Sequence, residues 1–257
     1  MKSAKIKIST VVKIVTTVTN KRVKRAKNPL LANGFIIYSG PSMFDGKPIV
    51  VIVTGSRTPT SNPKTGLMLQ TWILRSDLHP MEALRNASDV SVCGNCPLRP
   101  KGKNGSKRAC YVPIMGVNSI WEEYVFGNYG TVPNYSLGLS ARIGSYGDPT
   151  AVPIAVWKEL MTNVPFGTGY TRQWNNPKFQ EFKTFCQASC HNEVEYQQAI
   201  ALGWKAYVVR AEGSPVPIGA VQCPAVPYVT TCATCKMCNG NTTSISVEAH
   251  GNGKKYI

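Results

Sequence analysis

The densest set of reactive side chains in the chain is a run of cysteines near its C-terminus. Cys223 precedes Pro224, and Cys232, Cys235 and Cys238 follow at two-residue spacing in a segment rich in Gly, Pro and Thr. Thiolates at this spacing converge on one tetrahedral ion or on the corners of one cluster. We therefore predict a metal site at these four cysteines, and the spacing alone does not choose between Zn²⁺ and a [4Fe–4S] cluster.

A second group of cysteines lies in the first half of the chain. Cys93 and Cys96 stand in a C-x-x-C motif, and Cys110 follows after a basic loop. Three thiols need a fourth ligand to close a tetrahedral site, and without one the metal keeps the open position that catalysis requires. The candidates for a fourth ligand are Cys190, at a predicted strand end, its neighbour His191, and Cys186, which is alternatively a small buried strand residue.

Several polar side chains also stand at predicted strand ends, where an α/β sheet holds its ligands. We predict them as substrate-binding residues, although the segment 144–149 reads equally well as a tight turn. They are Arg142, Asp148, Arg172 and His250. Histidine is too scarce for ordinary zinc-hydrolase chemistry, and no Ser/His/Asp spacing indicates a hydrolase of that type.

The chain is strongly basic, because 29 Lys and Arg residues against 13 Asp and Glu give a formal net charge of +16. Such an excess favours polyanionic partners, nucleic acid before an anionic membrane surface. The alternative is that the basic clusters are solvated surface. We predict non-sequence-specific contact with nucleic-acid backbone by two clusters: Lys21, Arg22, Lys24, Arg25 and Lys27, and Arg99, Lys101, Lys103, Lys107 and Arg108.

The elements that must position these residues change character along the chain. Apolar, β-rich runs at 35–38, 49–54 and 70–75 are separated by turn signals, and 94–109 reads as loop. Strands then alternate with short helices, which is typical of βαβ units. The later strands are predicted at 137–143, 166–172, 184–189, 204–210 and 244–249, and the helices at 153–162, after Pro177, and at 193–202 behind an Asn192 cap.

This rhythm predicts an α/β fold in which consecutive βαβ units form a parallel sheet or a partial barrel. We expect a basic N-terminal arm or linker over residues 1–34 and a single α/β metal-binding domain over 35–257, with a cysteine-rich loop at 220–240. No stretch is apolar enough to span a bilayer, and nine cysteines without a secretory signal favour a reducing compartment. The predicted location is the cytoplasm.

The order of the motifs resembles that of a bacteriophage family known as gene-product-eighty-eight-like. The resemblance covers roughly residues 50–252 and implies a phage or prophage origin, with the host cytosol as location, but no activity. It is carried by Cys93-Gly-Asn-Cys96-Pro97, Arg108-Ala-Cys110-Tyr111-Val, Gly167-Thr-Gly-Tyr-Thr171, Cys223-Pro-Ala, Cys232-Ala-Thr-Cys235-Lys-Met-Cys238 and Glu248-Ala-His-Gly251.

The chain is also similar, at the level of fold, to radical S-adenosylmethionine enzymes. Three cysteines after an early strand, followed by successive βα units, carry this similarity, which implies an open-coordinate [4Fe–4S] cluster and S-adenosylmethionine as cofactor. Those enzymes place their three thiols in one CxxxCxxC loop, whereas Cys96 and Cys110 are fourteen positions apart here.

Three functions remain open from the sequence. The first is a metal-binding phage-type protein that binds nucleic-acid backbone in an accessory role. The second is an iron–sulfur enzyme with a reactive cluster at the Cys93 group and an auxiliary one at the Cys223 group. The third is a structural or virion protein in which metal serves only stability.

Overall fold

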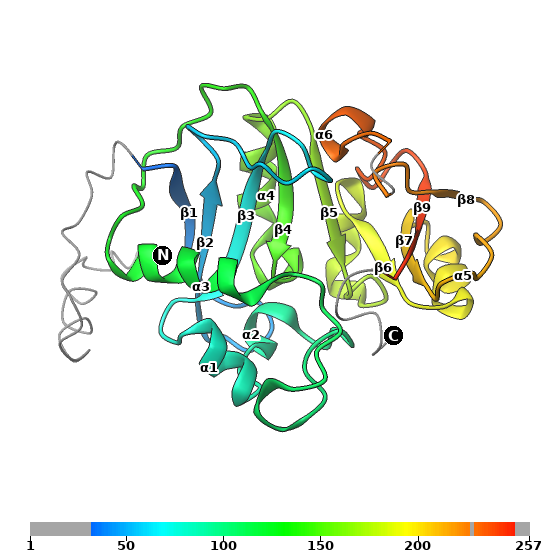
Figure 1. Cartoon of the computed structure of the whole chain (residues 1–257), viewed down its shortest axis with the longest axis horizontal. Helices are drawn as coiled ribbons and strands as arrows, with labels where there is room; N and C mark the ends of the chain where they lie inside the picture. Colours follow the sequence, from blue (N-terminus) through cyan, green and yellow to red (C-terminus); the bar gives the residue numbers. More distant parts are fainter. Residues whose placement is uncertain (1–31, 227–228, 250–257) are drawn as a thin grey trace, which may run out of the picture.

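The computed structural model describes residues 32–226 and 229–249, and these form one nine-stranded sheet. Its strand order is β1-β2-β3-β4-β5-β6-β7-β9-β8 (Figure 1). The predictions for the basic arm, including Lys21, Arg22, Lys24, Arg25 and Lys27, and for His250, lie outside the described residues. None of the described helices is long and apolar enough to cross a membrane.

The sheet begins with three antiparallel strands: β1 (Gly34–Pro41), β2 (Pro48–Thr54) and β3 (Met68–Arg75). The central β2 is apolar and buried from Ile49 to Val53, because β1 and β3 pair with its two edges and its side chains pack in the main apolar cluster. The three β-rich runs of the sequence are thus confirmed as strands. The expectation of parallel pairing holds only from β3 onward, where connections become long enough for crossovers.

From β3 to β9 each pairing is parallel, and β3 to β7 are neighbours in chain order. This consecutive order has no reversal, unlike that of a doubly wound sheet. The strands are β4 (Ser140–Tyr146), β5 (Gly167–Thr171), β6 (Gln187–Cys190), β7 (Ala206–Arg210), β8 (Ala220–Gln222) and β9 (Ser244–Glu248).

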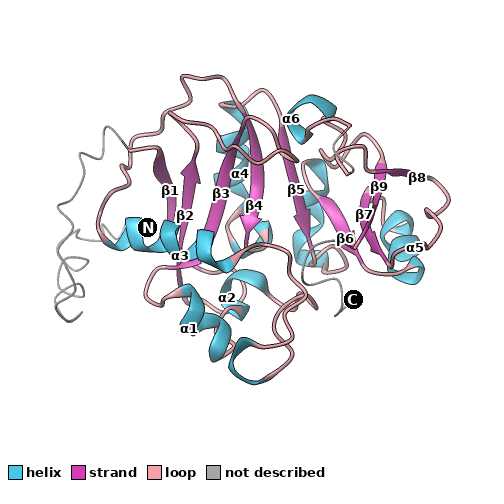
Figure 2. Ribbon diagram, in the orientation of Figure 1, coloured by secondary structure: helices cyan, strands magenta, loops and turns pink. Residues whose placement is uncertain are grey.

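Helices occupy the crossovers, as the secondary-structure colouring shows (Figure 2). Four of them, α1, α2, α3 and α6, lie in segments for which the sequence predicted no helix, and α6 lies within the predicted cysteine-rich loop. The elements are α1 (Pro80–Arg85), α2 (Val90–Cys93), η4 (Lys103–Gly105), α3 (Ile114–Val125), η5 (Pro149–Ala151), α4 (Ile154–Thr162), η6 (Pro177–Thr184), α5 (Glu193–Ala201) and α6 (Cys232–Cys235).

Several strand boundaries differ from the prediction, and two of the differences have a clear structural cause. The fourth strand, predicted at 137–143, ends at Tyr146, so the turn begins three residues later than predicted. The reason is that Thr71 of β3 accepts a hydrogen bond from Gly144 N at 2.7 Å, which continues the pairing past an irregularity in the register. The strand predicted from Thr184 starts at Gln187, since η6 continues to Thr184. The cap of α5 is confirmed, with the Asn192 side chain accepting from Glu195 N at 2.8 Å.

The core and the polar face of the sheet are segregated. Trp157 and Leu160 of α4 and Tyr196 of α5 are buried in the main apolar cluster, together with Ile143 of β4. Arg142, the neighbour of Ile143 on β4, is buried among polar and aromatic side chains instead. Because side chains alternate along a strand, Arg142 and Ile143 face opposite sides.

The two ends of the parallel strands carry different cysteine groups. In Figure 1 α1 and α2, with the loop that follows them, lie below the sheet where β3 ends, and α6 lies at the opposite, upper end. The Cys93 group is therefore at the carboxyl ends of the strands. The Cys223 group, in a segment that also contains β8 and α6, is at their amino ends.

Candidate functional site

The first cysteine group lies beside a cavity at the carboxyl ends of the parallel strands. Cys93 is the last residue of α2, and Cys96 and Cys110 stand in the loop after it. All three line a cavity of about 130 Å³. Residues 144–148, at and just after the end of β4, also line it, together with residues in or just after β5, β6 and β7: Tyr170, Arg172, Ser189, Tyr207 and Val209.

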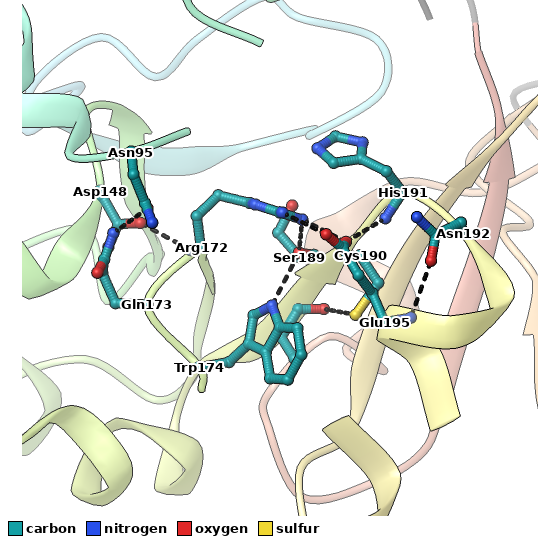
Figure 3. Close-up of polar contacts among 11 residues, drawn as sticks. Asn95, Asp148, Arg172, Gln173, Trp174, Ser189, Cys190, His191, Asn192 and Glu195 are labelled. Atoms are coloured by element: carbon teal, nitrogen blue, oxygen red, sulfur yellow. Dashed lines mark hydrogen bonds and ion pairs between the residues drawn. The ribbon is translucent and has the colours of Figure 1, made fainter. Parts of the chain in front are cut away.

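Two hydrogen bonds dock the Cys93–Cys96 turn onto the sheet. Asp148 N, just after β4, donates to Val92 O at 2.7 Å. Gln173 Nε2, just after β5, donates to Asn95 Oδ1 at 2.6 Å (Figure 3). Gly94 has φ +56°, and a Cβ there would stand 2.7 Å from Gln173 Nε2, so glycine allows this close approach.

The loop from Cys96 to Cys110 is closed by internal contacts. Cys110 N donates to Leu98 O at 2.9 Å, and Arg99 forms a two-pronged ion pair with the buried Asp89 at 2.6 and 2.9 Å. Arg108 donates through Nη1 to Cys110 O and to Val112 O. These contacts hold the second and third thiols at one wall of the cavity.

The same contacts divide the second basic cluster. Arg99 and Arg108, which we predicted as nucleic-acid contacts, instead donate hydrogen bonds from their guanidinium groups to Asp89 and to backbone oxygens of the protein. Lys101, Lys103 and Lys107 are exposed. Only these three of the five described residues have the free surface that contact with a nucleic-acid backbone requires.

Asp148, a predicted substrate residue, does line the cavity, but its carboxylate is engaged by the chain. It accepts from Thr150 N and Oγ1, from Thr171 Oγ1 and from Arg172 N, at 2.7 to 3.0 Å. Burial raises the pKa of Asp148, and these four hydrogen bonds oppose the rise. Asp148 therefore joins the ends of β4 and β5 and shapes the cavity wall.

Arg172 also lines the cavity and is held in place by Glu195. Its two terminal nitrogens each lie 2.9 Å from a Glu195 oxygen, and Nη1 also donates to Ser189 O (Figure 3). Glu195 in turn accepts from His191 N at 2.9 Å. Burial opposes ionisation of Glu195, but the bonds from Arg172 and His191 outweigh it and lower the carboxyl pKa.

The predicted fourth ligands do not reach this cavity. The Cys190 thiol donates to Ala188 O of its own strand at 3.6 Å, and burial raises its pKa to about 12. Cys186 is buried against Gly169 of β5. Burial lowers the pKa of His191 to about 4, and neither it nor the two cysteines belongs to the lining. Within the described residues the three-thiol group thus has no fourth cysteine or histidine beside it.

The second cysteine group lines a separate, much smaller cavity of about 20 Å³. Cys232 and Cys235 share one face of α6, since they are three residues apart on a helix. Cys232 N donates to Lys64 O at 2.9 Å and Ala233 N to Thr65 O at 3.0 Å, which docks α6 onto the loop before β3. The four thiols and Lys64 share the lining of this cavity: Cys223, Cys232, Cys235, Cys238 and Lys64.

Two tyrosines stand between the cavities. Tyr170 and Tyr207 line both, with ring centroids 4.4 Å apart. Arg142 lies over the Tyr170 ring at 5.9 Å and donates to the Tyr111 hydroxyl. It is absent from the lining of the larger cavity, so this predicted substrate residue lies between the two cysteine groups instead.

All nine cysteines are free thiols in the structure. Burial raises the pKa of Cys93 and takes that of Cys96 to about 11 and that of Cys238 to about 12. A metal would have to displace these protons. In residues 32–226 and 229–249 no three His, Cys, Asp or Glu side chains are positioned to hold one metal ion together, so occupancy of either group requires the thiols to turn inward.

Sequence reasoning missed the residues that join the two cavities. Tyr170 and Tyr207 line both cavities, Lys64 lines the smaller one, and the three come from distant segments that share no motif. Tyr170 lies within the Gly167–Thr171 segment of the family resemblance, which was the single available signal. Searches against protein-family models, curated proteins and solved structures each gave no match, so that resemblance rests on its motifs alone.

Proposed function

We propose that this protein is an iron–sulfur enzyme whose reactive centre is held by Cys93, Cys96 and Cys110. The observation that carries the proposal is that these three thiols line one cavity with the carboxyl ends of β4 and β5 and residues of β6 and β7. In α/β folds this edge of a parallel sheet is where substrates bind. The thiols thus lie beside the space in which a reaction would take place.

The donor set fits a cluster that has one iron without a protein ligand. Thiolates are the ligands of iron–sulfur clusters, and three of them leave one cluster iron open. The cavity of about 130 Å³ gives room beside the thiols for more than a single ion. Arg108 adds a positive charge at the lining, and its Nη2 is buried without a hydrogen-bond partner.

Such a cluster, when bound, supplies a redox-active, Lewis-acidic iron next to the substrate. The chain's own residues shape the space around it. Tyr146 and Val112 present apolar surface that excludes water from the cavity, and the Asp148 and Arg172 segments fix its floor through the hydrogen bonds between β4 and β5. Arg172, already paired with Glu195, orients rather than neutralises a ligand.

S-adenosylmethionine is the cosubstrate that this proposal favours. The consecutive order of β3 to β7, with the thiols in the segment between β3 and β4, supports an analogy with the partial barrel of radical S-adenosylmethionine enzymes. This is an analogy of fold, and the long spacing between Cys96 and Cys110 departs from it.

The test is to reconstitute the full chain anaerobically with iron and sulfide and to record its electron paramagnetic resonance after reduction with dithionite. We expect a cluster signal that changes when S-adenosylmethionine is added. The C110S variant should lose that change, whereas C190S should keep it, because Cys190 lies outside the cavity lining. A C110S protein with an unaltered response would refute the assignment.

A second function is favoured by the exposed Lys101, Lys103 and Lys107, which follow one another on the loop between the thiols. We propose that they contact nucleic-acid backbone, either as the enzyme's substrate or in an accessory role. Replacing all three by alanine should weaken binding to a random-sequence oligonucleotide. It should also lower the slope of log affinity against log salt concentration by the share of about three phosphate contacts. Equal affinity of the variant and the wild type would remove this proposal.

A further inference from the structure

We propose that Cys223, Cys232, Cys235 and Cys238 form a closed metal–thiolate centre, and that Arg142 and Lys64 are the cations that balance its charge. The proposal concerns different thiols from the enzymatic site and does not depend on it. It is carried by the two cations that the fold brings to the amino end of the sheet, next to these thiols. Within the described residues, the buried one, Arg142, has no ion pair with a carboxylate.

Arg142 is the clearer of the two cations. Its side chain is 8% exposed, it has no ion pair with any carboxylate of residues 32–226 and 229–249, and its Nε has no hydrogen-bond partner. A buried guanidinium without an anion is strongly unfavourable. A guanidinium stays protonated in proteins, so this charge persists and requires a counter-anion.

Lys64 approaches the same place from the loop before β3. It lines the cavity with the four thiols, and its Nζ lies 3.5 Å from the Tyr207 hydroxyl. Two cations beside one cluster of thiols repel each other, and ionised thiols at the same place would stabilise both of them.

A four-thiolate centre supplies the matching charge. Four thiolates around Zn²⁺, or around a dipositive [4Fe–4S] core, leave a net charge of about −2, which Lys64 and Arg142 cancel. Four protein ligands also close the coordination sphere, and the cavity of about 20 Å³ leaves no room for a substrate. The backbone hydrogen bonds from α6 to Lys64 and Thr65 place Lys64 directly beside the thiols of α6.

The experiment uses the full chain with Cys93, Cys96 and Cys110 replaced by serine, so that only this centre can bind metal. The protein is loaded with zinc alone or with iron and sulfide, which separates the two occupants. Metal per chain is measured, followed by the rate of its loss to a chelator. We expect one zinc site or one cluster, and we expect R142M to lose metal about tenfold to a hundredfold faster.

Matched variants distinguish charge from packing. R142K and K64R should hold metal nearly as the parent does, whereas K64M should lose it about tenfold faster. K158M, on the exposed face of α4, should match the parent. If R142M does not fold, the rate of metal loss from K64M tests the proposal by itself, because Lys64 is in a loop outside the strands and is only partly buried. Absence of bound metal under both conditions, or loss from K64M at the parental rate, would overturn the proposal.

Discussion

The two cysteine groups differ in almost every physical respect although both sit on one sheet. At the carboxyl ends three thiols line a cavity of about 130 Å³, and the cations beside them are largely held by Asp89, Glu195 or backbone oxygens. At the amino ends four thiols surround about 20 Å³, and the buried Arg142 has no carboxylate partner in the described chain. On our two proposals, ligand number, space and charge make the first group an open centre and the second a closed one.

This contrast shows how one donor type serves two purposes. A thiol group that leaves space and a coordination position free is suited to chemistry, whereas one that is saturated and charge-balanced is suited to stability. The same distinction predicts that equivalent substitutions at the two ends have unequal consequences.

The largest difference should come from single serine substitutions of one thiol at each end. C235S removes a ligand from the closed centre, and we expect a loss of at least about 4 kcal/mol in the free energy of unfolding of the metal-loaded protein, because structural metal binding is folding free energy. C110S should cost less than about 1 kcal/mol, since Cys110 is only partly buried. Denaturant titration of both variants measures the difference, and equal losses would mean two structural sites.

A smaller effect is expected at the ion pair that closes the open group's loop. Asp89 has a side-chain exposure of 1%, so D89N leaves Arg99 without its anion and should cost about 3–5 kcal/mol. The matched control is D77N, whose pair with Arg75 is at the surface (Asp77 42% exposed) and should cost under about 1 kcal/mol. Iron at the open centre should fall in D89N while metal at the closed centre stays; the reverse pattern would contradict the separation of the two ends.

The turn between the first two thiols can be probed by a single methyl group. G94A places a Cβ 2.7 Å from Gln173 Nε2 at a backbone conformation that side chains avoid, and should cost about 1–3 kcal/mol. G46A, also at positive φ but with nothing within 4 Å, should cost about 1 kcal/mol. A G94A protein as stable as G46A, by thermal unfolding, would show that the contact with Gln173 does not hold the turn.

The smallest of these effects depends on pH. Because the pKa of Glu195 is lowered in the folded state, its pair with Arg172 stabilises the protein above the ordinary carboxyl pKa and is lost as pH falls through the folded value. E195Q should therefore cost about 1 kcal/mol at neutral pH and progressively less in acid. Unfolding titrations from pH 7 to 3 measure it, and a cost that is independent of pH would exclude this pair as the cause.

Local patterns predicted those parts of the molecule that depend on local chemistry. The Asn192 cap before the helix predicted at 193–202 was readable because a cap is made by neighbouring residues. The alternation of strands and helices predicted the parallel half of the sheet in the same way.

Features that depend on strand order were not readable. Arg142 was predicted at a strand end facing substrate, but β4 continues to Tyr146, so Arg142 lies inside the strand and reaches Tyr111 and Tyr170 instead. Lys64 meets Tyr207 across 143 positions of sequence, a contact that only the assembled sheet produces. The separation of the two cysteine groups to opposite ends follows from the same tertiary order.

The most direct test of the account is the iron, sulfide and zinc content of the anaerobically prepared full chain, compared with its C93S/C96S/C110S variant. We predict a brown wild-type protein that contains iron and acid-labile sulfide, and a loss of about four iron atoms per chain in the variant, with the closed centre still occupied. A colourless wild type that holds zinc alone, or a triple variant that keeps all of its iron, would contradict the open iron–sulfur centre.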